Sequence, residues 1–188
     1  LGYSAAGIIT EVANDVTELQ VGDRVAVAGA GYANHADINF VPKNLVAKIP
    51  DGVSFHEAAY STVASIALQG VRLAKPQLGE NIAIIGLGLI GLITVQLLKA
   101  NGCRVIGFDP DQSKVELAHQ LGIDEADSSM GDARIKAVEK FTNGRLADCT
   151  IITASTSSND PAELAGEITR GKGQVAAVGA VGMDIPRN

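Results

Sequence analysis

The sequence contains few cysteines and no excess of basic side chains. Two cysteines among 188 residues are too few for a disulfide framework or for a four-cysteine zinc site. Lysine and arginine total 15 against 21 aspartate and glutamate residues, which gives a formal charge of −6 and a pI near 5.0. This balance offers no basic surface, so we expect no nucleic-acid partner. Only 19% of residues are charged and 46% are hydrophobic, which excludes a disordered chain.

The sequence also lacks a targeting signal and a convincing membrane span. Its first residues contain no basic region followed by an apolar core. Residues 81–98 carry no charge and approach the roughly 20 residues that cross a bilayer, but closely spaced glycines and three polar residues favour a buried strand, turn and helix. We therefore expect no membrane partner and a cytoplasmic location. Because the chain starts at Leu1 instead of Met and ends at Asn188, we expect a piece of a longer protein.

Short apolar runs separated by turn residues fill the first fifty residues. We expect strands over residues 7–12, 23–28, 32–41 and 45–49. These strands predict part of a small antiparallel barrel or sandwich. A helical stretch follows over residues 54–75, because Ser54 and Glu57 have the pattern of a capping box and Pro76 stops the run.

Strands and helices alternate from residue 80 onward. Apolar strands are expected at 82–85, 104–108, 125–128, 149–153 and 174–178, with helices at about 89–100, 111–121, 132–142 and 161–170. Asp160 is expected to cap the last helix and Gly171 to end it. Apolar strands separated by helices predict an α/β fold, a doubly wound parallel sheet with helices on both faces.

A glycine-rich segment, GLGLIG at residues 86–91, lies between the first of these strands and its helix. In this context a GxGxxG pattern is typical of dinucleotide binding. Gly86 permits the tight turn, Gly88 lets a pyrophosphate approach the backbone, and Gly91 lets the helix pack on the strand. The amides of Leu89 and Ile90 lie at a helix N-terminus, which favours an anion. An S-adenosylmethionine site and a turn that serves packing alone are the alternatives.

An acidic residue follows the second strand of this region. Asp109 lies 18 residues after Gly91 (109 − 91), where a carboxylate accepts hydrogen bonds from ribose hydroxyls and repels a 2′-phosphate. This position predicts NAD over NADP as the cofactor, and Lys114 lies within reach of the adenosine ribose. A helix cap is the alternative role for Asp109. Further contacts are expected where later strands end, in Thr153-Ala154-Ser155 and Gly179-Ala180-Val181, with Ala154, Gly179 and Val181 as the candidate residues. An ordinary loop without ligand contacts is the alternative for both segments.

The order of these segments resembles the medium-chain dehydrogenase/reductase superfamily, which includes the zinc-type alcohol dehydrogenases. The resemblance rests on Val21-Gly22-Asp23-Arg24-Val25, on VPKNLVAKIPDGVSFHEAA at 41–59, and on the glycine segment with Asp109. It covers essentially the whole chain. It implies a partial GroES-like domain over residues 1–53, connecting helices over 54–77, and a Rossmann NAD-binding domain over 78–188 that lacks its last strand.

The zinc ligands of that superfamily are absent from their expected places. Zinc-dependent members have Gly-His-Glu where this chain has Gly2-Tyr3-Ser4, and no cysteine occurs near residues 61–63. The remaining cysteines and histidines show no ligand spacing, namely Cys103, Cys149, His35, His56 and His119. We therefore predict no metal site.

The resemblance implies an oxidoreductase that transfers a hydride between NAD(H) and a small-molecule alcohol or carbonyl substrate. Without zinc, a carbonyl group must be polarised by hydrogen-bond donors. The hydroxyls of Tyr3, Ser4, Ser61 and Ser65 are candidates by position only, so the catalytic acid or base is not identified. A dinucleotide-binding module without chemistry, part of a larger multidomain protein, is the alternative. The resemblance also implies a homodimer of the full-length protein.

Overall fold

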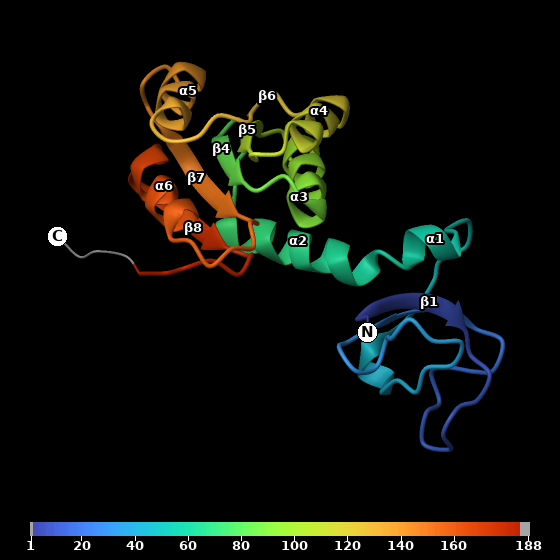
Figure 1. Cartoon of the computed structure of the whole chain (residues 1–188). Coiled ribbons are helices and arrows are strands. Elements are labelled where there is room, and N and C mark those ends of the chain that lie inside the picture. Colours follow the sequence, from blue (N-terminus) through green and yellow to red (C-terminus); the bar gives the residue numbers. More distant parts are fainter. Residues whose placement is uncertain (1, 185–188) are drawn as a thin grey trace. The chain divides into compact units, whose positions relative to one another are not determined.

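The structure is a computed structural model that describes residues 2–184. The two ends of the expected fragment, Leu1 and residues 185–188, lie outside the described residues. The chain forms two compact units, Leu1–Ser65 and Ile66–Asn188 (Figure 1). Within residues 2–184, no helix combines the length and the apolar character needed to cross a bilayer.

The first unit is built on a three-stranded antiparallel sheet. β1 (Ser4–Ile8) pairs with β2 (Arg24–Ala28), which pairs in turn with β3 (Val46–Lys48) after the short 3₁₀ helix η1 (Lys43–Leu45). Helix α1 (Phe55–Ala58) follows and begins with the predicted capping box, in which the Glu57 carboxylate accepts a hydrogen bond from the Ser54 N–H at 2.8 Å. The antiparallel sheet expected from the sequence is therefore confirmed.

Three expectations for this region are wrong in detail. The first strand ends at Ile8, because its pairing with β2 runs only from Ser4 to Ile8. No strand forms over residues 32–41, where the Asn39 side chain closes a local loop by bonding both the N–H and the carbonyl of Asn34. The expected helix over 54–75 is two helices, because α1 ends at Ala58 and α2 begins only at Ser61.

The second unit contains a five-stranded parallel sheet in the order β6-β5-β4-β7-β8. Its strands are β4 (Asn81–Ile85), β5 (Arg104–Phe108), β6 (Glu125–Asp127), β7 (Ala147–Ile152) and β8 (Thr169–Ala177). The helices are α2 (Ser61–Ala74), which spans the boundary between the units, α3 (Leu89–Ala100), α4 (Gln112–Gln120), α5 (Ala133–Phe141) and α6 (Asp160–Ile168). This order confirms the predicted doubly wound, Rossmann-type sheet.

Alternate residues of β4 pack into two separate cores. Ile82 and Ile84 lie in a cluster with apolar residues of α2, α3 and α4. Ala83 and Ile85 lie in a second cluster with residues of α5 and α6. Figure 1 shows the same arrangement, with α3 and α4 on one face of the sheet and α5 and α6 on the other. Because both faces are covered, the strands are apolar throughout, which is the pattern that the sequence displays.

The boundary between the last helix and the last strand differs from the prediction. Asn159 occupies the N-cap of α6, so Asp160 does not cap the helix and its carboxylate binds Arg134 instead. Gly171 lies inside β8 and does not end the helix. The chain becomes extended already at Thr169, whose hydroxyl donates to the Ala165 carbonyl at 2.6 Å and closes the last helical turn.

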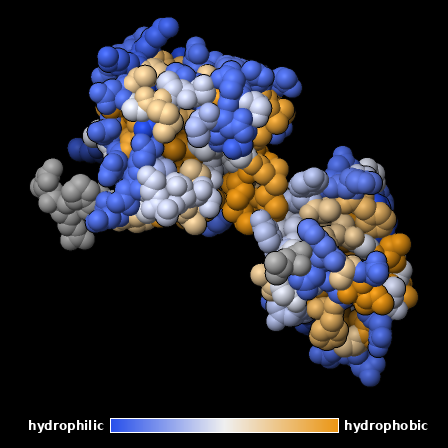
Figure 2. Space-filling view, viewed as in Figure 1, coloured by the Kyte–Doolittle hydropathy of each residue, from blue (hydrophilic) through white to orange (hydrophobic). Residues whose placement is uncertain are grey.

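Most apolar side chains of the second unit are inside it. Cys103 and Cys149 are each 2% exposed and belong to the core. In Figure 2 polar residues cover much of the visible face of this unit, and an apolar patch remains over the region of α2 and α3. Leu68 and Leu89, one from each helix, are exposed.

Candidate functional site

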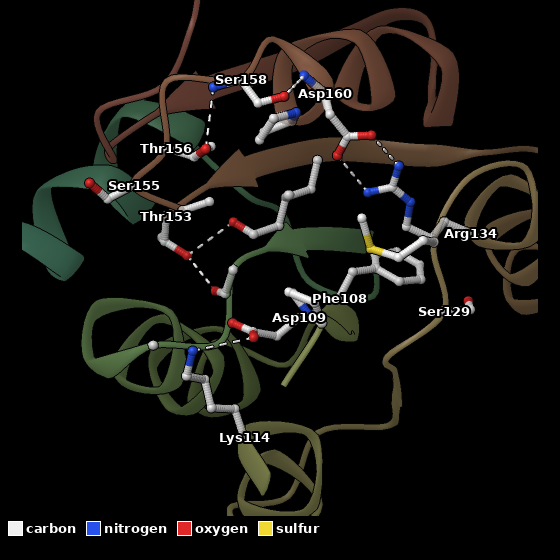
Figure 3. Close-up of a pocket in the computed structure, with 17 residues that line it drawn as sticks. Phe108, Asp109, Lys114, Ser129, Arg134, Thr153, Ser155, Thr156, Ser158 and Asp160 are labelled. Carbon is white, nitrogen blue, oxygen red and sulfur yellow. Dashed lines mark hydrogen bonds and ion pairs between the residues drawn. The ribbon is translucent and has the colours of Figure 1, made fainter. Parts of the chain in front are cut away.

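A cavity of about 610 Å³ opens where β4, β5 and β7 end at their carboxyl termini. It is lined by the glycine turn (residues 86–91), the segment after β5, the loop after β7 and the starts of α5 and α6 (Figure 3). Five of the predicted site residues line it, namely Gly86, Gly88, Asp109, Lys114 and Ala154. The chain continues from β4 to β5 on one side while β7 lies on the other, and open α/β sheets bind ligands at such a switch point.

The three glycines of the turn differ in how much space a side chain would have at each position. Gly86 has a φ of +100°, and a Cβ there would lie 2.6 Å from the backbone nitrogen of Ala154. A Cβ on Gly91 would overlap the Gly86 carbonyl oxygen. Gly88 has an ordinary φ of −70°, and no atom lies within 4 Å of the place where its Cβ would stand. Gly86 and Gly91 are therefore required by the turn itself, whereas Gly88 leaves an open space beside the backbone.

The start of α3 adjoins that open space. Gly88 is the N-cap, and no side chain caps the helix. The first intrahelical bond is donated by Leu92 to the Gly88 carbonyl at 2.9 Å. The preceding N–H groups, including those of Leu89 and Ile90, have no acceptor within a helix. No acidic residue occurs in this first turn, so the positive end of the helix dipole is available to an anion.

Asp109 holds the glycine turn from the β5 side. Its Oδ2 accepts a hydrogen bond from the Leu87 N–H at 2.9 Å, while its Oδ1 accepts from the Asp111 N–H at 3.0 Å and from Lys114 Nζ at 3.3 Å. The cap of α4 is Asp111, which accepts from the Ser113 N–H at 3.0 Å, so the helix-cap alternative for Asp109 is wrong. A carboxylate offers about four acceptor positions, and Oδ2 therefore retains one for a ligand.

Thr153 holds the same turn from the β7 side. Its hydroxyl donates to the Gly86 carbonyl at 2.6 Å and lies 3.3 Å from the Ile85 carbonyl, as Figure 3 shows. The backbone N–H groups of Thr153 and Ala154 donate to the Ile85 carbonyl at 2.9 and 3.0 Å. The glycine turn is thus bonded to both neighbouring strands. Sequence reasoning missed this role because it depends on the pairing of β4 with β7.

An ion pair that the sequence did not reveal borders the cavity between α5 and α6. Arg134 is 5% exposed, and its guanidinium binds the Asp160 carboxylate through two hydrogen bonds of 2.6 and 2.8 Å. The hydrogen bond from Arg134 lowers the pKa of Asp160, and Asp160 in turn raises the pKa of Arg134. The two residues are 26 positions apart on different helices, so local spacing gave no signal.

The cavity wall formed by the ends of β5 and β6 is largely apolar. Phe108, Pro110 and Met130 line it, together with Ser129. The Ser129 Oγ is buried and has no hydrogen-bond partner among the residues that the structure describes. A buried hydroxyl without a partner costs about 1–3 kcal/mol, so this atom favours a ligand that presents a polar group to it.

The other five predicted residues are not among those that line the cavity: Leu89, Ile90, Gly91, Gly179 and Val181. Gly179 supports the cavity wall from behind, because a Cβ there would overlap the Ala154 carbonyl. Val181 is partly buried against the core beneath α5 and α6. The structure therefore brings Gly179 close to Ala154 without exposing it to the cavity.

The hydroxyls considered as carbonyl-polarising groups lie in the first unit, and most have partners already. Three serines donate to backbone carbonyls, namely Ser4 to Ala59, Ser61 to Ala58 and Ser65 to Ser61. Tyr3 is 44% exposed. Across residues 2–184, no three His, Cys, Asp or Glu side chains are grouped so that they could hold a metal ion.

Known proteins resemble this chain along most of its length. Residues 90–188, just over half of the chain, match the family described as zinc-binding dehydrogenase. The D-guloside 3-dehydrogenase of Escherichia coli K12 is 34% identical over 155 residues, which cover 82% of this chain and 44% of that enzyme. An alcohol dehydrogenase of Geobacillus stearothermophilus is 30% identical over 213 aligned positions, covering 98% of this chain and 62% of that enzyme. The chain thus spans about half the length of these relatives.

Solved structures agree with this relationship. A mycobacterial protein in complex with NADPH has a TM-score of 0.83 and 26% identity, and the match covers 100% of this chain and 59% of that one. The chain therefore belongs to the zinc-binding dehydrogenase family, within the medium-chain dehydrogenase/reductase superfamily.

Proposed function

We propose that the cavity binds NAD(H), and that the protein containing this chain transfers a hydride between NAD(H) and an alcohol or carbonyl substrate. The open space beside Gly88, at the uncapped start of α3, carries the proposal. A diphosphate fits there because it would meet unpaired N–H groups and no side chain. The remaining acceptor position of Asp109 would take a ribose hydroxyl, and the apolar wall around Phe108 would take the adenine ring.

The preference for NAD over NADP rests on the charge of Asp109. A carboxylate just after β5 repels a 2′-phosphate and accepts a hydrogen bond from a ribose hydroxyl of NAD. Lys114 lies 3.3 Å from that carboxylate and offsets part of its charge. The mycobacterial neighbour was solved with NADPH, so the balance between Asp109 and Lys114 is the feature to test.

We propose further that the reaction proceeds without zinc. The described residues contain no cluster of metal-binding side chains. By the family resemblance, Tyr3 stands where zinc-dependent members carry the histidine that binds the metal. The cofactor supplies the hydride, and this chain binds and orients the cofactor. Hydrogen-bond donors would then polarise the substrate carbonyl. Because the hydroxyl of Ser4 already donates to a backbone carbonyl, Tyr3 is the candidate donor in this part of the chain.

Cofactor titration tests the binding part of the proposal. The sequence has no tryptophan, so NADH emission can be followed with little protein background. We expect NADH to bind at least about tenfold more tightly than NADPH, which corresponds to about 1.4 kcal/mol. S-adenosylmethionine should not displace NADH. Equal affinity for NADPH would contradict the role of Asp109, and displacement by S-adenosylmethionine would contradict the choice of cofactor.

A dinucleotide-binding module without chemistry is the second candidate. The serine hydroxyls that are hydrogen bonded to backbone carbonyls favour it, because they leave few donors for a substrate. Full-length protein incubated with NADH and a panel of aldehydes, ketones and quinones distinguishes the two. Oxidation of NADH above background supports the enzyme, and binding without turnover across the panel supports the module. A homodimer of the full-length protein and a cytoplasmic location stay predictions.

A further inference from the structure

We propose that Thr153 is a positioning residue for the dinucleotide, because its hydroxyl fixes the glycine turn in the geometry that leaves Gly88 and the start of α3 open. The inference rests on the proposed NAD(H) site and adds a residue that acts through the turn. Its starting point is the short hydrogen bond of 2.6 Å from Thr153 Oγ1 to the Gly86 carbonyl oxygen.

Three groups converge at this hydrogen bond. Gly86 is buried, and its N–H donates to the Phe108 carbonyl at 2.8 Å. Its carbonyl oxygen, shielded from water, accepts from the Thr153 hydroxyl just after β7. The place where a Cβ of Gly91 would stand lies 2.9 Å from Thr153 Oγ1 and overlaps the Gly86 oxygen. The first turn of α3 therefore rests directly on the hydroxyl and on the carbonyl that it binds.

The turn is bonded at two consecutive residues by side chains that directly follow two different strands, β5 and β7. From β5, the Asp109 carboxylate accepts from the Leu87 N–H, and from β7, the Thr153 hydroxyl donates to the Gly86 carbonyl. Opposite sides of the turn are thus fixed before any ligand arrives. A binding site held in its bound geometry loses less free energy to ordering when the ligand binds.

Valine at position 153 would preserve the shape of threonine but not this contact. A methyl group and an oxygen that do not share a hydrogen bond stay about 3.5 Å apart, whereas Thr153 Oγ1 lies 2.6 Å from the Gly86 oxygen. The turn must move away from β7 to make room, and the buried Gly86 carbonyl loses its side-chain donor. Both effects displace the backbone beside Gly88, where the diphosphate would bind.

Thr150, which lies in β7 three residues before Thr153, provides a matched control. It is fully buried, and its hydroxyl shares a hydrogen bond of 2.7 Å with the Thr169 hydroxyl. It is not among the residues that line the cavity. Thr150→Val therefore removes a buried threonine hydroxyl from β7 without touching the glycine turn.

The binding experiment compares Thr153→Val, Thr153→Ser and Thr150→Val in the complete 188-residue chain by NADH fluorescence titration, with melting curves for each. We expect Thr153→Val to weaken NADH binding about tenfold and Thr153→Ser, which keeps the donor, to stay within about twofold of wild type. Thr150→Val should lower the melting temperature and leave NADH affinity unchanged. Wild-type affinity in Thr153→Val, or equal weakening in Thr150→Val, would overturn the proposal.

Amide hydrogen exchange in the absence of cofactor provides a second readout. We expect faster exchange at Leu87 and Leu92 in Thr153→Val, and wild-type exchange in Thr153→Ser. If Thr153 acted only by touching the cofactor, Thr153→Val would weaken binding while this exchange stayed unchanged, which would overturn the positioning role. If wild-type protein fails to bind NADH, the proposed function fails, and the exchange experiment still decides whether Thr153 fixes the turn.

Discussion

The carboxylate of Asp109 accepts a hydrogen bond from the backbone N–H of Leu87 at 2.9 Å, so the acid that ends β5 is bonded to the glycine turn that ends β4. The Leu87 side chain is fully buried and lies against Gly107, where a Cβ would stand 2.7 Å from it. The second residue of the turn is therefore fixed by its side chain in the core and by its N–H on Asp109. Asp109, the residue that we propose to bind the ribose, therefore also holds the glycine turn in place.

Replacing Asp109 should affect both cofactor choice and stability. Asp109→Ala removes the acceptor of the Leu87 and Asp111 N–H groups, so we expect the free energy of unfolding to fall by about 1–3 kcal/mol and NADH binding to weaken. Asp109→Asn keeps an oxygen acceptor but removes the charge, and it should narrow the difference in affinity between NADH and NADPH. Fluorescence titration and urea denaturation measure the two effects. An unchanged preference in Asp109→Asn would remove the electrostatic argument for NAD.

A side chain at position 88 should block the cofactor without unfolding the protein. Gly88→Val adds atoms to a space with no neighbour within 4 Å, at a φ of −70° that any residue adopts. We expect NADH binding to be lost while the melting temperature stays near that of wild type. Gly171→Val is the matched control, because Gly171 also has open space around it and does not line the cavity. Tight NADH binding by Gly88→Val would place the diphosphate elsewhere.

A side chain at position 86 should destabilise the fold, unlike a side chain at position 88. Gly86 has a φ of +100°, and its Cβ would lie 2.6 Å from the Ala154 nitrogen, so Gly86→Ala introduces both strain and a backbone clash. We expect a loss of about 1–3 kcal/mol or more in the free energy of unfolding, measured by urea denaturation. Gly88→Ala serves as the comparison. Equal stability of the two variants would show that the turn tolerates a side chain at either glycine.

The ion pair between Arg134 and Asp160 should stabilise the fold only above acidic pH. Arg134 lowers the pKa of Asp160 in the folded state. The stabilisation is therefore complete above the unfolded-state pKa of about 3.9 and disappears as the pH falls through the lower folded-state pKa. The Asp160 side chain is 44% exposed, so its ion pair contributes little to stability. We expect its loss to lower the melting temperature by a few degrees at most.

Melting curves of wild type and Asp160→Asn test this directly. The difference in melting temperature should be largest near neutral pH and should shrink toward zero as Asp160 becomes protonated. A difference that does not depend on pH would assign the effect of the substitution to packing, not to the charge.

Neither cysteine should react in the folded protein at mildly alkaline pH. Burial raises the pKa of the Cys149 thiol to about 12 and also raises the pKa of Cys103. The thiolate is the reactive form, and both side chains are inaccessible. Titration with a thiol-specific disulfide reagent at pH 8 should label neither residue in native protein and both in guanidinium chloride. Rapid labelling of one thiol in the native state would contradict this environment.

The sequence predicted the fold best where the signal is local. The expected strand 82–85 and helix 89–100 correspond to Asn81–Ile85 and Leu89–Ala100, because an apolar run and a glycine turn specify both. The prediction failed at residues 32–41, where apolar residues occur without a neighbouring strand in the described structure. It also failed at Gly171, because the end of α6 is set by the Thr169 hydroxyl and not by a glycine.

Within the candidate site, too, the sequence predicted the residues with a local signal and missed those whose partners are distant in the chain. Gly86, Gly88 and Asp109 follow a known spacing along the chain, and the structure places all three at the cavity. Thr153 and Arg134 also line the cavity, but their partners lie far away in the sequence. Their roles become visible only when the strand order and the helix positions are known.

The hydrogen bond between Thr153 and Gly86 connects residues 67 positions apart. During synthesis on a ribosome, β4, α3 and β5 emerge well before β7. Until then the glycine turn is held from the β5 side, by Phe108 and Asp109, and not from the β7 side. Contacts that close so long a loop form after local ones, since the entropy of closure must be overcome first. A nascent chain can therefore form the full set of hydrogen bonds that hold its glycine turn only after residue 153 has left the exit tunnel.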